Sequence, residues 1–508
     1  MNVIANSKVE FGDFQTPPHL AEAICRLLSN RGFSPASIVE PSCGVGAFLV
    51  AALNQFPDAT HFLGVERNEE YVQLAKAAVN RVPGQSDRHI EILHSDFFST
   101  NWQDLLATLP KPILILGNPP WVTNAVQGTF GGTNLPQKIN SQNLPGIDAL
   151  TGKSNFDISE WMIRQSLEWL DRSSGMVAVL CKTAVARKVL FDAWSRRRPI
   201  ATAEIRRIDA KRHFDAAVEA CLLVMTVQPE ARPSQGGKDY ESLDATAPRR
   251  VFGLREDMLI ADIPLYEQRR NLLGHGLSGW RSGIKHDCSS VFELTPNGAH
   301  YKNKLDLDVV VEEQVVFPLL KSSDLAKNQQ PRKWLLVPQR TMAESPELLQ
   351  HTAPKAWSYL SSHRTLLAKR ASSIYRNRPA FSIFGVGAYS FSPWKVGISG
   401  LYKKLDFVPI SPFKGRPVVL DDTCYFFACE TELECSTLHR LVMSQAAQEF
   451  WSSLIFWDAK RPITAQMLNL LDLKTLAQTV GMVSGVARRL AERQVVSYQP
   501  GVHQPLLL

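Results

Sequence analysis

Residues 37–48 read Ser-Ile-Val-Glu-Pro-Ser-Cys-Gly-Val-Gly-Ala-Phe, and this stretch decides the fold that we expect. A short apolar run ends in Glu40 and meets a turn with two glycines, and the apolar stretch 48–53 that follows suits a helix. A strand, a glycine turn and a helix in this order let the backbone approach a nucleotide-like cofactor. The spacing is not the dinucleotide-binding pattern, because Leu49 stands where a third glycine would be. A plain tight turn is the alternative interpretation.

The next two predicted strands also end beside polar side chains. Residues 61–66 form an apolar run that ends in Glu66, where an acid hydrogen-bonds ribose hydroxyls in nucleotide-binding sheets. Residues 90–93 lead to Asp96 and Phe97, an acid for an adenine amino group and a ring to cover the base. Open α/β sheets bind ligands at the carboxyl ends of their strands. The pattern therefore predicts a mostly parallel sheet with flanking helices and a nucleotide-like ligand at that edge.

A fourth predicted strand, residues 112–117, runs into the tetrapeptide Asn118-Pro119-Pro120-Trp121. Two consecutive prolines cannot continue a central strand, so the strand ends in a rigid, extended turn. The Asn118 side-chain oxygen and the Pro119 carbonyl can accept both hydrogen bonds of one planar amine, while Trp121 offers a face for its ring. Accepting both N–H bonds makes the nitrogen more nucleophilic, which favours methylation of an exocyclic amine. An ordinary strand-to-loop turn is the alternative.

Together these segments resemble the S-adenosylmethionine-dependent DNA amino-methyltransferases of bacterial restriction-modification systems. The order of cofactor motifs, catalytic motif and recognition region is similar to that of the gamma group of adenine-specific enzymes. The matching motifs cover about the first 225 residues, from Phe11 onward. The resemblance implies a Rossmann-like class I methyltransferase domain, S-adenosyl-L-methionine as cofactor and no metal ion.

The resemblance also implies roles for single residues. It places Thr16 and Pro17 in the segment that closes over the methionine end of the cofactor. The cofactor-binding residues that it implies are Thr16, Pro17, Glu40, Gly44, Gly46, Glu66, Asp96 and Phe97. The catalytic residues that it implies are Asn118, Pro119, Pro120 and Trp121. Trp121 stands where many relatives carry Tyr or Phe, a change that preserves stacking.

Two later segments resemble further motifs of this family. Residues 155–162 predict an amphipathic helix beside the catalytic strand, with a simple core helix as the alternative. Residues 212–224 are similar to the late motif whose aromatic residue, here Phe214, stacks on the target base, and a buried core phenylalanine is the alternative. An adenine inside a duplex must be flipped out to reach a cofactor. We therefore expect the flipped base to lie between Trp121 and Phe214. We expect the proton released by the target amine to go to solvent.

Proline and glycine residues interrupt a polar stretch between Gln228 and Arg250. We therefore predict a catalytic domain at 1–230, a linker at 231–248 and a mixed α+β target-recognition domain at 249–508. In the last of these we expect short strands at 309–311 and 418–420 and a helix over 432–450.

The charge changes in the second half of the chain. Residues 245–420 hold 25 Lys or Arg against 14 Asp or Glu, a net +11, whereas the whole chain carries +7 and the remainder therefore −4. Basic residues interleave with aromatic ones, for example in 369–378, which suits double-stranded DNA as the partner. For any single arginine, a solvated surface position is the alternative.

The composition argues against several other classes. The chain has no N-terminal apolar segment and no run of about 18 apolar residues, so we expect a cytoplasmic protein with no membrane partner. The eight cysteines contain no C-x-x-C pair and read as reduced thiols. Because the motifs begin near residue 11, we expect a companion restriction endonuclease that shares the target sequence to be a separate protein.

Three alternatives to adenine-N6 methylation remain. The tetrapeptide chemistry also serves the cytosine N4 amine, although the motif order favours adenine by resemblance. Methylation of RNA or of a protein glutamine uses the same tetrapeptide, but leaves the basic second half unexplained. A non-catalytic DNA-binding protein that keeps the fold is the third, against which the intact Gly44, Gly46, Glu66, Asp96 and Asn118 argue.

Overall fold

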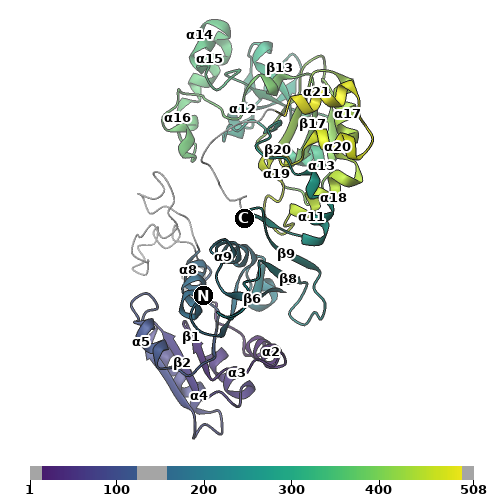
Figure 1. The fold of residues 1–508 in the computed structure, drawn as a ribbon. Coiled ribbons are helices and arrows are strands. Elements are labelled where there is room, and N and C mark those ends of the chain that lie inside the picture. The colour runs from purple at the N-terminus through teal and green to yellow at the C-terminus, as the bar shows by residue number, and fades with distance from the viewer. Residues whose placement is uncertain (1–13, 123–156, 495–508) are drawn as a thin grey trace. The chain divides into compact units, whose positions relative to one another are not determined.

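The computed structural model describes residues 14–122 and 157–494 of the 508-residue chain. These residues form two compact units, one ending at Ile263 and one beginning at Pro264 (Figure 1). In this described part of the chain, no helix is both long and apolar enough to cross a bilayer.

The first unit is built on a sheet that has ten strands among the described residues, in the order β10-β9-β8-β6-β7-β5-β4-β1-β2-β3. These strands are β1 (Ser37–Glu40), β2 (His61–Glu66), β3 (His89–His94), β4 (Ile113–Gly117), β5 (Gly175–Lys182), β6 (Ile200–Ile208), β7 (Ala220–Val227), β8 (Gly236–Tyr240), β9 (Arg250–Arg255) and β10 (Met258–Ile260). Strands β1 to β5 are parallel, and β7 lies antiparallel between β5 and β6. The strand order reverses at β1, so the carboxyl ends of β1 and β4 form the point at which such sheets bind ligands.

Helices flank this sheet (Figure 1). They are α2 (Pro18–Ser29), α3 (Ala47–Gln55), α4 (Glu69–Asn80), α5 (Trp102–Ala107), α8 (Ile158–Leu170), α9 (Thr183–Ser195) and α10 (Ala210–Phe214). Helix α2 packs on α3, and α8 packs on α9. Buried apolar side chains of α2, α3 and α4 share one core with the strands. The predicted Rossmann-like α/β fold is confirmed, with each of the four predicted strands in place.

The predicted linker at 231–248 is wrong. Strand β8 lies in this segment, pairs in parallel with β6, and is followed by β9 and β10, which extend the same sheet. Its glycines permit close packing rather than flexibility, because a Cβ on Gly237 would lie 3.1 Å from the Phe252 ring. The first unit therefore runs to Ile263, beyond the predicted end of the catalytic domain at residue 230.

The second unit is mixed α+β, as predicted. Over the described residues it has a four-stranded sheet, β11-β20-β17-β18, and a six-stranded sheet, β14-β13-β12-β16-β15-β19. Its strands are β11 (Trp280–Ser282), β12 (Glu293–Asn297), β13 (His300–Lys302), β14 (Asp308–Val309), β15 (Val316–Leu320), β16 (Lys333–Leu336), β17 (Trp394–Ser399), β18 (Phe407–Ile410), β19 (Val419–Leu420) and β20 (Cys424–Cys429). Its α-helices are α12 (Ser289–Phe292), α13 (Ser322–Ala326), α14 (Leu349–Thr352), α15 (Pro354–Ser362), α16 (Arg364–Ala368), α17 (Glu432–Val442), α18 (Gln445–Leu454), α19 (Ala465–Leu468), α20 (Leu473–Thr479) and α21 (Gly485–Glu492), and α11 (Ile263–Arg269) joins the two units. Short 3₁₀ helices are η1 (Arg270–Leu272), η2 (Glu313–Val315), η3 (Pro346–Leu348), η4 (Ser373–Tyr375) and η5 (Ala388–Phe391).

Three predicted elements of this unit differ from those observed. The strand expected at 309–311 is β14, which ends at Val309, and the strand expected at 418–420 is β19, which begins at Val419. The single helix expected over 432–450 is two helices, α17 and α18. The break lies at Ser444, whose hydroxyl accepts from the Ala447 N–H and caps the second helix.

Candidate active site

The glycine turn after β1 positions the acid at the end of β2. Gly44 and Gly46 have φ angles of 50° and 84°, and a Cβ on Gly46 would lie 3.1 Å from the Ala75 Cβ. The Gly44 N–H donates to Glu66 Oε2 at 2.9 Å, and the Asn68 N–H donates to Glu66 Oε1 at 2.7 Å. Two backbone donors thus fix the Glu66 carboxylate at the sheet edge, and its remaining lone pairs can still accept from ribose hydroxyls.

Glu40, at the end of β1, is a buried acid with an unused acceptor. Burial raises the pKa of this carboxyl well above its usual value, and the charge of Glu66 acts in the same direction. Its Oε2 atom is buried and has no hydrogen-bond partner among the described residues. A buried oxygen without a partner is costly, so this atom suits a hydrogen-bond donor of a bound ligand.

Asp96 and Phe97 follow β3, and their two side chains have different surroundings. Asp96 Oδ1 accepts from the Phe98 N–H at 2.8 Å, and Arg67 Nε lies 3.4 Å from Oδ2. The Phe97 ring is buried in an aromatic cluster, with centroids 5.3 Å from Trp102 and 5.8 Å from Trp161. In this arrangement Phe97 serves as core rather than as a free face for a base.

Asn118 has its side-chain amide fixed from one side. Its Nδ2 donates to the Phe14 carbonyl at 2.8 Å, while its Oδ1 is buried and has no hydrogen-bond partner in the described part of the chain. It follows Gly117, whose φ of 151° turns the chain at the end of β4. Pro119 is buried and Pro120 is partly buried. The amide is therefore oriented so that one acceptor oxygen awaits a donor.

The two rings predicted to hold the target base contact each other instead. Trp121 and Phe214 are both buried, with centroids 5.2 Å apart at an interplanar angle of 69°, and Phe14 lies 5.7 Å from Trp121 and 6.2 Å from Phe214. The Trp121 indole N–H points at the Leu180 carbonyl at 3.4 Å. The expectation that a base lies between Trp121 and Phe214 does not hold for this arrangement, because edge-to-face rings in contact leave no slot for a third ring.

The segment before α2 bridges the glycine turn and the catalytic turn. Gln15 Oε1 accepts from the Val45 N–H at 3.2 Å, and the neighbouring Phe14 carbonyl holds Asn118. Thr16 and Pro17 follow in partly buried positions, and the Pro17 carbonyl accepts from the Leu20 N–H at 3.0 Å as α2 begins. Thr16 and Pro17 thus directly follow the two residues that make these contacts, and their role at the cofactor stays a prediction.

Lys182 and Asp157 are site residues that the sequence reasoning missed. Lys182 ends β5, and its Nζ donates to the Trp121 carbonyl at 2.8 Å and to Asp157 Oδ2 at 2.6 Å. Asp157 caps α8 by accepting from the Ser159 N–H at 3.1 Å. Asn155 and Phe156, which belonged to the predicted helix, lie outside the described residues, and α8 begins at Ile158. A fifth strand end with a polar residue was the signal that could have identified Lys182.

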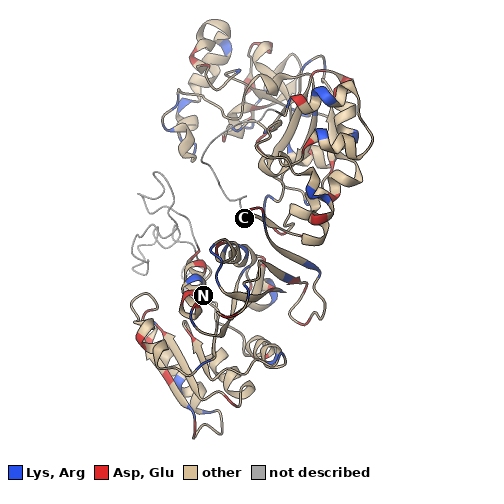
Figure 2. Cartoon of the chain, viewed as in Figure 1, with Lys and Arg blue, Asp and Glu red and all other residues tan. Residues whose placement is uncertain are grey.

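Lys and Arg residues occur throughout the second unit, on helices and strands alike (Figure 2). Some are neutralised internally, because the buried Glu293 lies 2.7 Å from Lys321, 3.0 Å from Lys333 and 3.3 Å from Lys304. Although burial opposes ionisation, hydrogen bonds from Lys321 and Lys333 lower the pKa of Glu293 to about 2. Among the described residues, no group of three or more His, Cys, Asp or Glu side chains is placed to hold a metal ion.

Comparison with known proteins gives a family match to the first part of the chain and a curated relative that matches nearly all of it. Residues 1–187 match the family model N-6 DNA Methylase. The type II methyltransferase M.NspV of Nostoc sp. (strain ATCC 29411 / PCC 7524) is 41% identical over 480 residues, which cover 94% of this chain and 99% of that protein.

The solved structures that match this chain are more distant in sequence. The type IIL restriction-modification enzyme MmeI in complex with DNA is 13% identical, with a TM-score of 0.49 over 97% of this chain and 77% of that chain. The ATP-dependent type ISP restriction-modification enzyme LlaBIII bound to DNA is 11% identical, with a TM-score of 0.42 over 81% of this chain and 34% of that chain.

Proposed function

Because the chain belongs to the type II DNA methyltransferases of the N-6 DNA methylase family, we propose that it methylates the exocyclic N6 amine of adenine at one short sequence in double-stranded DNA. The methyl donor in this proposal is S-adenosyl-L-methionine. In the same proposal, the modification protects that sequence from a companion restriction endonuclease.

The Asn118 amide is the observation that carries this proposal. Its Nδ2 is committed to the Phe14 carbonyl, so the orientation of the amide leaves the buried Oδ1 as an acceptor without a partner among the described residues. An exocyclic amine has two N–H donors, and Asn118 Oδ1 with the Pro119 carbonyl would accept both. These two hydrogen bonds draw the nitrogen lone pair out of the ring and aim it, which increases its nucleophilicity and fixes its direction of attack.

The residues around the glycine turn fit the proposed cofactor. Glu66 is held by two backbone N–H groups in a position suited to ribose hydroxyls, and Asp96 lies at the end of the next strand. The unpartnered Glu40 oxygen offers an acceptor for a donor group of the same ligand. S-adenosyl-L-methionine, when bound, supplies an electrophilic methyl group. Thr16 and Pro17 would close the site toward its methionine end.

Access of the base to this site requires two movements. A paired adenine cannot reach Asn118, so the nucleotide is flipped out of the duplex. Stacking on Trp121 then requires Phe14 or Phe214 to move away from the indole, since the three rings are now in contact. The Lys182 bond to the Trp121 carbonyl keeps the backbone of the tetrapeptide in place during this exchange.

Cytosine N4 is the second candidate target, because Asn118 and Pro119 accept from any planar amine. To separate the two, the full chain is expressed in a methylation-deficient bacterial host, and the host DNA is sequenced by a method that reports modified bases. We expect N6-methyladenine at one short repeated sequence. N4-methylcytosine would overturn the choice of base but leave the mechanism, and unmodified DNA with soluble protein present would contradict the proposed function.

The catalytic assignment is tested with two asparagine variants in the same host. Asn118→Ala is expected to abolish modification while the Kd for S-adenosylmethionine changes less than about twofold. Asn54→Ala is the matched control, since Asn54 is exposed on α3 and, among the described residues, its side chain bonds only the Val50 carbonyl of its own helix. A loss of cofactor affinity in Asn118→Ala would show that Asn118 acts on the cofactor rather than on the amine.

A further inference from the structure

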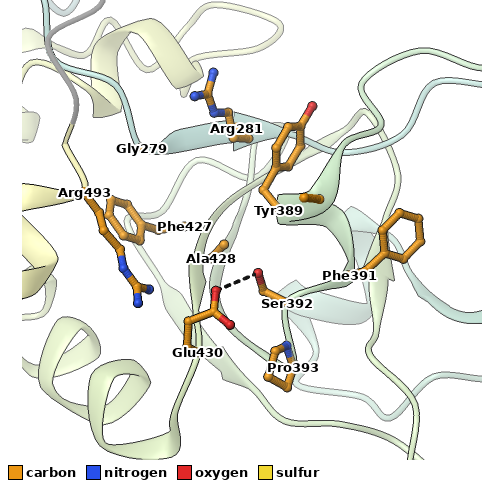
Figure 3. Close-up of a pocket in the computed structure, with 11 residues that line it drawn as sticks. Gly279, Arg281, Tyr389, Phe391, Ser392, Pro393, Phe427, Ala428, Glu430 and Arg493 are labelled. Atoms are coloured by element: carbon orange, nitrogen blue, oxygen red, sulfur yellow. Dashed lines mark hydrogen bonds between the residues drawn. The ribbon is translucent and has the colours of Figure 1, made fainter. Parts of the chain in front are cut away.

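The second unit contains an open pocket of about 470 Å³ on its four-stranded sheet (Figure 3). Strands β11 and β20 and the 3₁₀ turn η5 supply its lining. The side chains that matter here are Arg281, Tyr389, Ser392, Phe427 and Glu430. The pocket therefore combines aromatic walls with a guanidinium, a hydroxyl and a carboxylate, a composition suited to a planar polar ligand.

The walls of the pocket are fixed by specific contacts. A Cβ on Gly279 would lie 2.3 Å from the Phe427 ring, which is too close for any other residue. Glycine at this position therefore allows the start of β11 to approach that ring. The fully buried Lys395 donates to the Ser392 carbonyl at 2.5 Å. The Ser392 hydroxyl in turn donates to Glu430 Oε1 at 3.4 Å, the bond drawn in Figure 3. These contacts hold the carboxylate end of the pocket in place.

Arg281 and Glu430 carry opposite charges, yet neither takes part in an ion pair within the described residues. Both are exposed, and Arg281 lies over the Tyr389 ring with its Cζ 5.5 Å from the ring centroid. Arg493, which also lines the pocket, is instead committed to Glu434 at 2.9 Å. One pocket thus presents a donor fork oriented by an aromatic ring and a separate acceptor. Neither is held in an ion pair among the described residues, although the charge of the buried Lys395 acts on Glu430.

We propose that this pocket reads the major-groove edge of a G·C base pair in the recognised sequence, with Arg281 donating to guanine and Glu430 accepting from cytosine. This assignment rests on the proposed function. Guanine is the base that offers two adjacent acceptors, O6 and N7, to a guanidinium fork, and cytosine presents the N4 donor that a carboxylate accepts. An A·T pair offers one acceptor beside one donor on adenine and fits the fork less well.

A phosphate group fits the pocket poorly for an electrostatic reason. The Glu430 carboxylate would repel it, and the Arg493 charge is already neutralised by Glu434. A ligand with both acceptors and donors on one planar edge can hydrogen-bond to both Arg281 and Glu430. We therefore place sequence reading, rather than backbone contact, at Arg281 and Glu430.

The test uses the full-length protein and duplexes that carry the sequence found by the modified-base sequencing described above. Each guanine in turn is replaced by 7-deazaguanine, which lacks the N7 acceptor, and kcat/KM for methyl transfer is measured. We expect the wild-type rate to fall about tenfold at one guanine. Arg281→Ala should be slower on the unmodified duplex and insensitive to 7-deazaguanine at that position, while responding normally at the others.

Two further variants separate reading from folding. Arg281→Lys keeps the charge but loses the fork, so it should match Arg281→Ala in its insensitivity while keeping wild-type affinity for unrelated DNA. Glu430→Ala should reduce the rate penalty for replacing the same G·C pair by A·T. Arg332→Ala is the matched control, because Arg332 is a largely exposed arginine of this unit paired with Asp324. It should respond to every analogue as the wild type does.

The outcomes are distinct. If Arg281→Ala and 7-deazaguanine lower kcat/KM independently of each other at every guanine position, the proposal is overturned. A recognised sequence without a G·C pair would also overturn it. In both cases the wild-type protein still methylates DNA, so the proposed function survives. If the wild type methylates no DNA, the proposed function fails, and this assignment fails with it.

Discussion

Replacing Lys182 by Met tests whether the catalytic turn depends on a contact from the neighbouring strand. The Lys182 ammonium bonds both the Trp121 carbonyl and Asp157, and its loss leaves a nearly buried carboxylate without its cation. Breaking a buried pair costs about 3–5 kcal/mol, but Lys182 is 26% exposed and solvent compensates part of this. We expect about 2–3 kcal/mol of destabilisation, since a hydrogen bond to a charged group contributes about 1.5–3 kcal/mol.

Part of that energy should appear in catalysis, because the freed Trp121 carbonyl lets the turn move relative to the cofactor site. If about 1.4–2.8 kcal/mol of transition-state stabilisation is lost, the single-turnover rate falls about 10- to 100-fold. The Kd for S-adenosylmethionine should stay within about twofold of the wild-type value, since Lys182 contacts none of the predicted cofactor residues. Rapid-quench methylation with saturating cofactor and DNA measures the rate, and calorimetry measures the Kd.

The matched control is Lys188→Met, since Lys188 on α9 pairs with Glu160 on α8 at 3.8 Å and makes no hydrogen bond or ion pair with the tetrapeptide among the described residues. It removes a lysine but should leave the single-turnover rate unchanged. Lys182→Arg should recover part of the rate by restoring a cation for Asp157. Equal rates for Lys182→Met and Lys188→Met, at equal melting temperatures, would refute the reasoning.

Three further predictions concern single side chains. Glu66→Ala should weaken S-adenosylmethionine binding at least about tenfold by calorimetry, since the loss of a hydrogen bond to a charged group costs about 1.5–3 kcal/mol. Unchanged affinity would count against the ribose role. Trp121→Ala should slow methyl transfer more than Trp121→Phe, and equal rates would argue against stacking. Glu293→Gln should lower the melting temperature at pH 7 by several degrees. Because the pKa of Glu293 is lowered to about 2, the Glu293 carboxylate stabilises the fold fully above about pH 4.5, and this stabilisation is lost as pH falls toward 2. The melting temperatures of the variant and the wild type should therefore converge in acid. A difference that stays constant with pH would contradict this linkage.

The first half of the chain was the more predictable half. Strand ends at Glu40, Glu66 and Asn118 lie where the apolar runs and turn residues placed them. Such signals are local, because a strand needs only a short apolar run and a glycine or proline turn marks its end. The same rule failed at 231–248, where glycines serve close strand packing inside the sheet.

The aromatic residues show what short sequence patterns do not predict. Trp121, Phe214 and Phe97 were each predicted to offer a ring face to a base, yet all three are buried against other rings. Aromatic side chains serve equally as core and as stacking surface, and sequence alone does not separate these uses.

By itself, the sequence determined the α/β class and the order in which polar residues reach the edge of the sheet, since periodicity and turn chemistry act over a few residues. The resemblance of its motifs indicated the family. Only the tertiary structure decided which of these residues act together. The Asn118 amide is oriented by a carbonyl 104 positions earlier, at Phe14, and the Trp121 carbonyl is held by Lys182, 61 positions later. Hydrogen bonds and charges act through space over a few ångströms, so partners distant in sequence become identifiable once packing has brought them together.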